Sequence, residues 1–458
     1  MRARVESRMG HSGRLSLVVF LLSWSALIPE VCIAQQLVPE EMLTLKTAIE
    51  IALKNHPTIE AQVGQVATGE AKLGQARGNY YPRLSLAGSY TTIEPVSART
   101  AATTSSSGLP PGNFVPTGIQ GRYDQYATVG SLNQLLFDFG KTGAQVSAQK
   151  LSTQAARHDL ASAKEQVTFD VKQAYYTLLG TQLAQGVTVE SVEQFKKQLV
   201  RARALYDEGV KPKLDVTKAE VDLSNAEVTA TKAEYAVKVA RATLNNAMGL
   251  PDHSDYNLEN DLTSGTAEQS FEDALRIALA HRPDLLSLQD KKESARQSIK
   301  AAERTHLPTL NGSATLTYVG DSFPLDYGWT AGVVMVLPLF TGFVTAYQVA
   351  EAQAALSVAR ASERSLRQTI VLDLEQGFLA LNEATKRMGS TEVALKQARE
   401  NVELATERYT AGLAIAIEVT DALTARANAE LAHIGALYDR KIAQARIEKA
   451  IGDGRSRL

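Results

Sequence analysis

The chain has 458 residues, a formal net charge of −2, 21% charged residues and a single cysteine, Cys32. A nearly balanced charge without a basic block argues against nucleic acid as a partner, and one cysteine cannot form an intrachain disulfide. The seven histidines form no i, i+4 pair, and no phosphate-binding glycine loop or nucleophile elbow occurs. We therefore expect no enzymatic activity, no cofactor and no metal site.

The first residues have the composition of a secretory signal peptide. Four arginines within residues 2–14 precede an apolar stretch at 15–28, and Ala34 is a small residue suited to cleavage before Gln35. We expect residues 1–34 to be removed on export; lipidation of Cys32 is the alternative. No later apolar run reaches the roughly 18 residues of a transmembrane helix. An exported chain can still enter a membrane through the strands of a closed barrel.

The mature sequence is an internal duplication. AIEIALKNHP at 48–57 recurs as ALRIALAHRP at 274–283, an offset of 226, whereas matching residues farther on, such as Gly209 and Gly412, differ by 203. The two offsets differ by 23 residues, which we place in the first copy between about Tyr90 and Phe137. The duplication predicts a first repeat at 35–249, a linker or equatorial segment at 250–269, a second repeat at 270–452 and a tail at 453–458.

Each repeat contains a long helical hairpin, at 140–249 and at 342–452. Residues 140–207 contain no proline, and a helix of that length would span roughly 100 Å. Apolar residues from Val216 to Leu244 alternate spacings of three and four, which predicts a left-handed coiled hairpin. In the second copy Arg426 and Arg440 occupy seam positions, so this helix is expected to face a different neighbour.

Short segments with a period of two precede each hairpin. They predict strands at about 83–92 and 123–136 in the first repeat and at about 309–318 and 327–339 in the second. One apolar and one polar face is the pattern of a membrane barrel strand. The 23 extra residues fall within 97–121, which is rich in Ser, Thr, Gly and Pro and is predicted to be a long loop.

Four strands cannot close a barrel alone, since the smallest barrels need about eight. The repeated order of helices and strands resembles the TolC-type outer-membrane efflux family over about residues 40–453. The paired motifs that carry the resemblance lie at 55–57 and 281–283, at 136–140 and 339–342, and at 206–216 and 409–419. The resemblance implies a mostly α protomer that forms a homotrimer, with a twelve-stranded β-barrel continued by a long α-helical periplasmic barrel.

The same resemblance implies a function. The protein would be the passive exit duct of a tripartite efflux or type I secretion system, in the outer membrane of a Gram-negative bacterium and extending into the periplasm. Its partners would be a periplasmic adaptor and an inner-membrane pump or ABC exporter. The alternative is a periplasmic coiled-coil scaffold or adaptor. The sequence does not name the cargo (drug, metal ion or protein), the pump or the adaptor.

The candidate functional residues lie at the two hairpin tips. The resemblance implies a periplasmic gate or constriction, formed by Asp215, Tyr409, Glu418 and Asp421. From the residues alone, the preferred interpretation of Glu418 and Asp421 is an exposed helix N-terminus, where the helix dipole favours carboxylates. The expected tip and adaptor-docking residues are Tyr206, Gly209, Lys211, Lys213 and Gly412.

The family's closed state can be held by a latch of an Asp, a Tyr and an Arg. Asp215 and Tyr409 match the first two, but Ala414 stands at the Arg position. Lys211 or Lys213 on the first tip either replaces the missing charge or contacts an adaptor.

Overall fold

A computed structural model describes residues 42–94, 122–251, 256–259 and 270–452. The predicted signal peptide, the predicted loop at 97–121, the tail at 453–458 and most of the linker at 250–269 lie outside the described residues.

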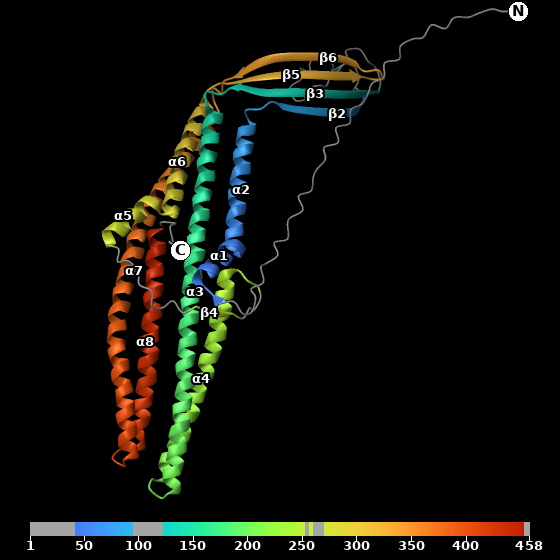
Figure 1. Cartoon of the computed structure of the whole chain (residues 1–458). Helices are drawn as coiled ribbons and strands as arrows, with labels where there is room; N and C mark the ends of the chain where they lie inside the picture. Colours follow the sequence, from blue (N-terminus) through green and yellow to red (C-terminus); the bar gives the residue numbers. More distant parts are fainter. Residues whose placement is uncertain (1–41, 95–121, 252–255, 260–269, 453–458) are drawn as a thin grey trace, which may run out of the picture. The chain divides into compact units, whose positions relative to one another are not determined.

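The two repeats form matching sets of helices (Figure 1). The long first helices of the two hairpins each have 67 residues, and the returning helices each have 36. The first repeat contains α1 (Leu45–Asn55), α2 (Pro57–Gly78), α3 (Lys141–Asp207) and α4 (Lys213–Met248). The second contains α5 (Phe271–His281), α6 (Pro283–Glu303), α7 (Val344–Thr410) and α8 (Ala416–Ile451). No helix among these described residues is both long enough and apolar enough to cross a membrane.

Proline and the preceding residue begin the second helix of each repeat. Pro57 opens α2, and His56 caps it by accepting a hydrogen bond from the backbone N–H of Thr58 at 3.2 Å. Pro283 opens α6, but the preceding Arg282 has a different role. Its buried guanidinium donates hydrogen bonds to carboxylates on α6 and α7 and to a carbonyl on α8. His56 and Arg282 occupy equivalent positions of the duplication, but His56 caps one helix whereas Arg282 joins three helices.

Four antiparallel strands form one sheet in the order β2-β3-β5-β6. The strands are β2 (Arg83–Ile93), β3 (Tyr123–Phe137), β5 (Thr309–Gly320) and β6 (Asp326–Val336). Each repeat supplies one adjacent pair, and the β3–β5 pairing joins the two repeats. The last strand ends at Val336 rather than near Leu339, because Pro338 has no N–H with which to extend the ladder.

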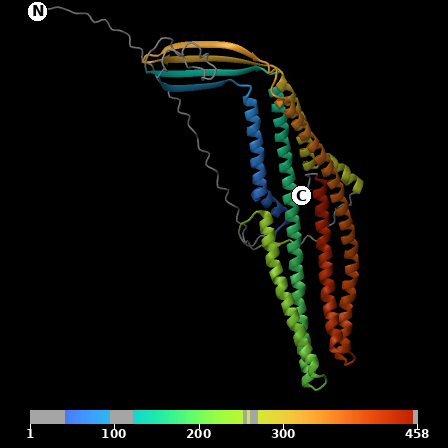
Figure 2. The same cartoon turned by 180° about the vertical axis from the view of Figure 1, so that it is seen from behind.

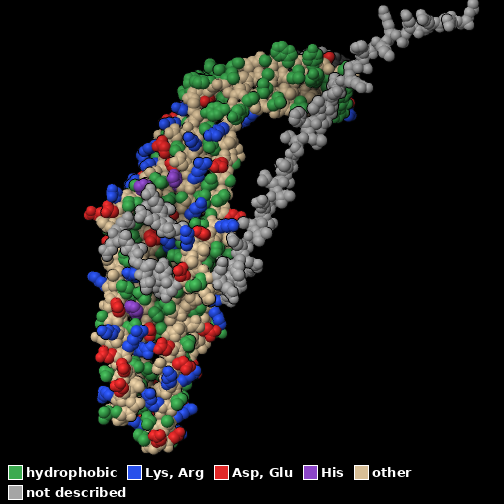
Figure 3. All heavy atoms as spheres, viewed as in Figure 1, with side chains coloured by type: hydrophobic (Ala, Val, Ile, Leu, Met, Phe, Trp, Pro, Cys, Tyr) green, Lys and Arg blue, Asp and Glu red, His purple; other side chains and the backbone are tan. Residues whose placement is uncertain are grey.

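The strand register separates a mainly apolar face from a mainly polar face, as the alternation predicted. Leu84 pairs with Leu132, which pairs with Ala314, which pairs with Ala331, so these four residues share one face. The same face carries Leu86, Tyr90, Tyr126, Leu310, Leu316, Tyr318, Tyr327, Trp329, Val333 and Met335. The other face carries Ser85, Ser89, Thr91, Ser131, Asn311, Ser313, Thr315, Thr317 and Thr330. Apolar side chains cover the sheet in Figure 3, whereas charged side chains are spread over the helices.

The long helix α3 is central to the helical part. It packs against α2 and α4 on one side and against α6 and α8 on the other, while α7 packs against α6 and α8 (Figures 1 and 2). The lateral order of the two hairpins is therefore α4-α3-α8-α7. The contact of α8 with α3 confirms that the second returning helix faces a neighbour outside its own hairpin.

A short parallel pair, β1 (Met42–Leu43) and β4 (Asn257–Leu258), lies beside α3. The hydroxyl of the fully buried Tyr175 lies 3.0 Å from the carbonyl of Leu43 and 2.8 Å from that of Glu259. This contact ties the start of the first repeat and the linker to the middle of α3.

Candidate gate at the hairpin tips

Two turns of the same construction close the hairpins. Gly209 and Gly412 have φ values of +74° and +76°, a left-handed conformation that glycine adopts without a steric penalty. The next residue donates a hydrogen bond back into the ending helix in each turn: Val210 to the carbonyl of Leu205, and Leu413 to that of Arg408, both at 2.9 Å. The predicted role of these glycines as turn residues agrees with this geometry.

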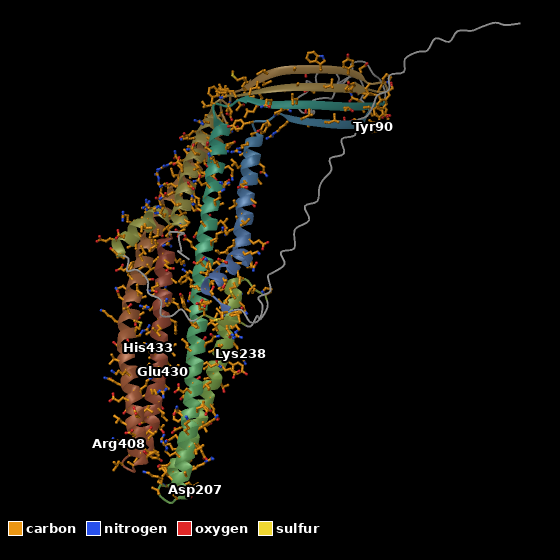
Figure 4. All side chains as sticks on the ribbon, in the orientation of Figure 1. Tyr90, Asp207, Lys238, Arg408, Glu430 and His433 are labelled. Atoms are coloured by element: carbon orange, nitrogen blue, oxygen red, sulfur yellow. The ribbon has the colours of Figure 1, made fainter. Side chains whose placement is uncertain are left out.

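The tyrosines that end the two long helices have different environments. Tyr206 at the end of α3 is 43% exposed, whereas Tyr409 at the end of α7 is 1% exposed. Tyr409 packs in an apolar cluster that includes Phe195 and Ala226 of the first hairpin and Val419 of α8. The two hairpins therefore meet around Tyr409, close to their tips, which Asp207 and Arg408 mark in Figure 4.

Lys211 reaches across from the first tip to the second. Its Nζ lies 5.2 Å from the centroid of the Tyr409 ring and donates a hydrogen bond to the carbonyl of Ala414 at 3.3 Å. A cation over an aromatic face is attracted by the ring quadrupole. Ala414, which occupies the Arg position of the latch, therefore contacts Lys211 of the other hairpin through its backbone carbonyl.

Asp215 also acts on Tyr409 from the first tip. Burial raises the pKa of the Tyr409 hydroxyl, the Asp215 carboxylate raises it further, and Arg201 opposes the shift. The hydroxyl is buried without a hydrogen-bond partner of normal geometry among the described residues. Asp215, Lys211 and Tyr409 are therefore brought together, whereas Lys213 is exposed on α4.

The two predicted constriction carboxylates differ in their contacts. Glu418 Oε1 accepts a hydrogen bond from the backbone N–H of Ile415 at 3.4 Å, and Oε2 lies 3.5 Å from Arg408 Nη1. Glu418 therefore caps the start of α8, and Arg408 of α7 partly neutralises its charge. Asp421 is exposed one turn farther along α8.

Some polar contacts between the hairpins involve residues that were not selected from the sequence as candidate site residues. Thr420 Oγ1 donates to Asp222 Oδ2 at 3.0 Å, and Arg426 donates to Glu190. The charged Arg426 at a seam position was a visible signal in the sequence. Asp222 had no such signal, since it only flanks the apolar seam residue Leu223.

Comparison with known proteins gives the same assignment as the paired motifs. Residues 48–250 and 274–453 match the family model for outer membrane efflux proteins. The chain belongs to the outer membrane efflux protein family. Members of this family are transport channels of the outer membrane, and the protein is located there and extends into the periplasm.

Individual relatives are distant but cover most of the chain. The outer membrane efflux protein BepC of Brucella suis biovar 1 (strain 1330) is 23% identical over 418 residues, covering 89% of this chain and 85% of BepC. TolC of Escherichia coli (strain K12) is 24% identical over 340 residues, covering 70% of this chain and 68% of TolC. The crystal structure of VceC from Vibrio cholerae superposes with a TM-score of 0.75 at 21% identity, covering 89% of this chain and 96% of VceC. The shared fold is that of an outer-membrane channel protomer.

Proposed function

We propose that this protein is the passive exit duct of a tripartite efflux or type I secretion system. The observation that carries the proposal is the sheet, whose apolar face suits lipid and whose polar face suits a water-filled lumen. Its outer strands are β2, the first strand of the first repeat, and β6, the second strand of the second repeat. Pairing β6 of one copy with β2 of the next keeps the antiparallel alternation and forms a ring.

The helices support the same ring. On α4 an exposed apolar stripe repeats every seven residues, at Leu214, Val221, Val228 and Tyr235. On α7 the exposed residues Val358, Leu372, Leu379 and Val393 lie at multiples of seven. Such stripes are typical of coiled-coil seams, and α4 and α7 are the outer helices in the lateral order of the hairpins. Three copies would give the twelve strands of the proposed barrel and a continuous helical tunnel beneath it.

The hairpin tips are the proposed docking surface for a periplasmic adaptor, through which the duct would meet an inner-membrane pump or ABC exporter. Beside the tip glycines, Val210, Leu214, Leu413 and Ile415 are exposed apolar residues. Exposed apolar patches on an otherwise polar surface mark sites of protein–protein contact. A scaffold or adaptor is less well supported, because neither role explains a sheet whose apolar face carries many exposed large side chains.

The gate we propose is the contact of Lys211 with Tyr409 and Ala414, which holds the two hairpins together at the tips. Separation of the hairpins would break this contact. The selective carboxylate we propose is Asp421, because three copies would place three exposed carboxylates at the entrance and favour cations. Glu418 would contribute less, since Arg408 lies beside it.

Conductance in planar bilayers tests the duct. The purified protein should give stepwise, cation-preferring conductance. Asp421→Asn should lower the cation preference, and Glu418→Gln, the matched control, should lower it less. Trimers in the bilayer without conductance would contradict the duct, and a monomer confined to the periplasmic fraction would favour the scaffold.

A further inference from the structure

Charged side chains are scarce on the four-stranded sheet. The charged residues of its four strands are Arg83, Asp124 and Asp326. Asp124 pairs with Thr92 on the mainly apolar face, whereas Arg83 and Asp326 belong to the mainly polar face. Arg83 is the first residue of β2 and follows α2, so it lies at the end of the sheet that joins the helices (Figure 1).

The neighbours of Arg83 on the polar face carry no charge. Arg83 pairs with Asn133 of β3, and Ser313 and Gly332 continue the same row across β5 and β6. In the second repeat the equivalent of Arg83 is Thr309, at the offset of 226. Each copy of the chain therefore contributes one cation to this row.

A neutral partner orients the guanidinium of Arg83. Its Nη2 donates a hydrogen bond to Oδ1 of Asn79, the residue that ends α2, at 2.6 Å. Asp138, the acidic residue between β3 and α3, is buried and accepts hydrogen bonds from the backbone N–H groups of Gly140 and Thr142. Because the amide of Asn79 is uncharged and Asp138 caps a helix, the exposed guanidinium keeps its positive charge.

We propose that Arg83 forms a cationic ring where the barrel lumen meets the helical tunnel, and that this ring favours anions. The inference rests on the proposed duct, in which three copies turn the polar face of the sheet inward. Rings of arginine or lysine in a pore select for anions. The ring therefore opposes the cation preference that Asp421 supplies at the entrance, and it attracts anionic groups on a passing cargo.

The spacing of the ring predicts how its effect depends on salt. Successive copies of Arg83 are separated by four strands, which is about 19 Å along the barrel wall. The Debye length is about 30 Å at 0.01 M salt and about 3 Å at 1 M. The three charges therefore act together at low salt and are screened from the centre of the lumen at high salt.

Reversal potentials across a KCl gradient at low salt test the ring. Arg83→Gln removes the charge but keeps an amide that can bind Asn79, and it should raise the permeability ratio of K⁺ to Cl⁻ about two-fold or more. Arg83→Lys keeps the charge and should keep the ratio of the unmodified protein. Asp124→Asn, the matched control on the other face of the sheet, should leave the ratio unchanged. The effect of Arg83→Gln should disappear at 1 M salt.

Chemical modification of one thiol gives a second test that compares a folded channel with itself. Cys32 is the single cysteine of the chain and lies in the predicted signal peptide, so Arg83→Cys carries one reactive thiol after export. A cationic thiosulfonate reagent should restore the ratio of the unmodified protein. An anionic one should raise the cation preference further. If neither reagent changes the ratio, Arg83 does not line the lumen and the proposal is wrong.

The outcomes separate the ring from the duct. An unchanged ratio in Arg83→Gln, together with a lowered cation preference in Asp421→Asn, would overturn the ring and leave the duct intact. Equal shifts in Arg83→Gln and Arg83→Lys would assign the effect to the contact with Asn79 rather than to charge, which also overturns the ring. No conductance from the unmodified protein would remove the duct and the ring with it.

Discussion

At the scale of single residues, the two copies of the duplication differ at the tips, where the hairpins meet. Tyr206 and Tyr409 occupy equivalent positions, yet only Tyr409 is buried, because the first hairpin lies over it. Lys211 and Ala414 also occupy equivalent positions, 203 residues apart, yet the lysine side chain is the donor and the alanine backbone is the acceptor of one hydrogen bond. The environment of each residue of the proposed gate is therefore set by which surfaces of the two hairpins face each other.

Removing the Lys211 charge should weaken the closed gate. Lys211→Met keeps much of the side-chain length but loses the contact over the Tyr409 ring and the hydrogen bond to Ala414. Together these are worth about 1–2 kcal/mol, or about a ten-fold shift toward the open state. Single-channel open probability measures this shift.

Two variants serve as controls for the gate. Lys211→Arg should retain most of the closed state, and Lys213→Met, on the same tip but exposed, should have little effect. Equal opening by Lys211→Met and Lys213→Met would show that net charge at the tip, rather than the observed contact, holds the gate.

Asp290 on α6 should make the stability of the helical part depend on pH. Burial raises the pKa of its carboxyl, and His158 on α3, 3.5 Å away, opposes the shift. A raised carboxyl pKa means that the ionised form is disfavoured in the folded state. The group therefore destabilises the fold above its folded pKa, and this cost disappears as the pH falls below the unfolded value of about 3.9.

Asp290→Asn should accordingly raise the denaturation midpoint at pH 7.5, because the amide removes the buried charge. The gain should shrink at pH 4.5. Asp284→Asn, which weakens a carboxylate bound by Arg282, should lower the midpoint at pH 7.5. A loss of stability in Asp290→Asn at pH 7.5 would show that the pair with His158 outweighs the cost of burial.

At the scale of helices, the periodicity of the sequence predicted long hairpins, and the structure adds the joints that hold them. Arg282 is one such joint, since it connects the start of α6 to Asp373 of α7 and to the carbonyl of Ala450 on α8. The paired helix starts at 55–57 and 281–283 were visible in the sequence. Their different roles were not, because the partners of Arg282 lie 91 and 168 residues away.

Replacing this arginine should destabilise the second repeat. Arg282→Met leaves two carboxylates and a carbonyl without their buried cation, at a cost of about 2–4 kcal/mol. Thermal unfolding followed by circular dichroism in detergent should show a midpoint several degrees lower. Arg276→Met is the matched control, because its ion pair with Asp273 is exposed and contributes about 0–1 kcal/mol. Equal midpoints for the two variants would contradict a structural role for Arg282.

At the scale of the whole molecule, the unpaired strands predict how copies join. A cysteine on β2 (Ser85→Cys or Ser89→Cys) combined with Thr330→Cys on β6 should cross-link neighbouring copies through a short bis-maleimide. The products should form a ladder that ends at three chains on a denaturing gel. The control pair Ser131→Cys and Thr315→Cys, on the paired inner strands, should cross-link only within a chain. A ladder that continues past three, or that ends at two, would refute a closed ring of three protomers.

Some features of this protein are local properties of the chain, and the sequence by itself determined them. The change from a period near 3.5 to a period of two and the glycines of the tip turns depend only on neighbouring residues, and the duplication is visible when the two halves of the sequence are compared. They were enough for the helices, the strands, the two faces of the sheet and the family. Only the tertiary structure decided that Tyr409 is buried, that Lys211 contacts Ala414, that Glu418 lies beside Arg408 and that the exposed residues Phe139 and Phe343 have positive φ values. These features depend on side chains that approach each other across the packed hairpins, or on the backbone that joins sheet and helix, and neither leaves a periodic trace in the sequence.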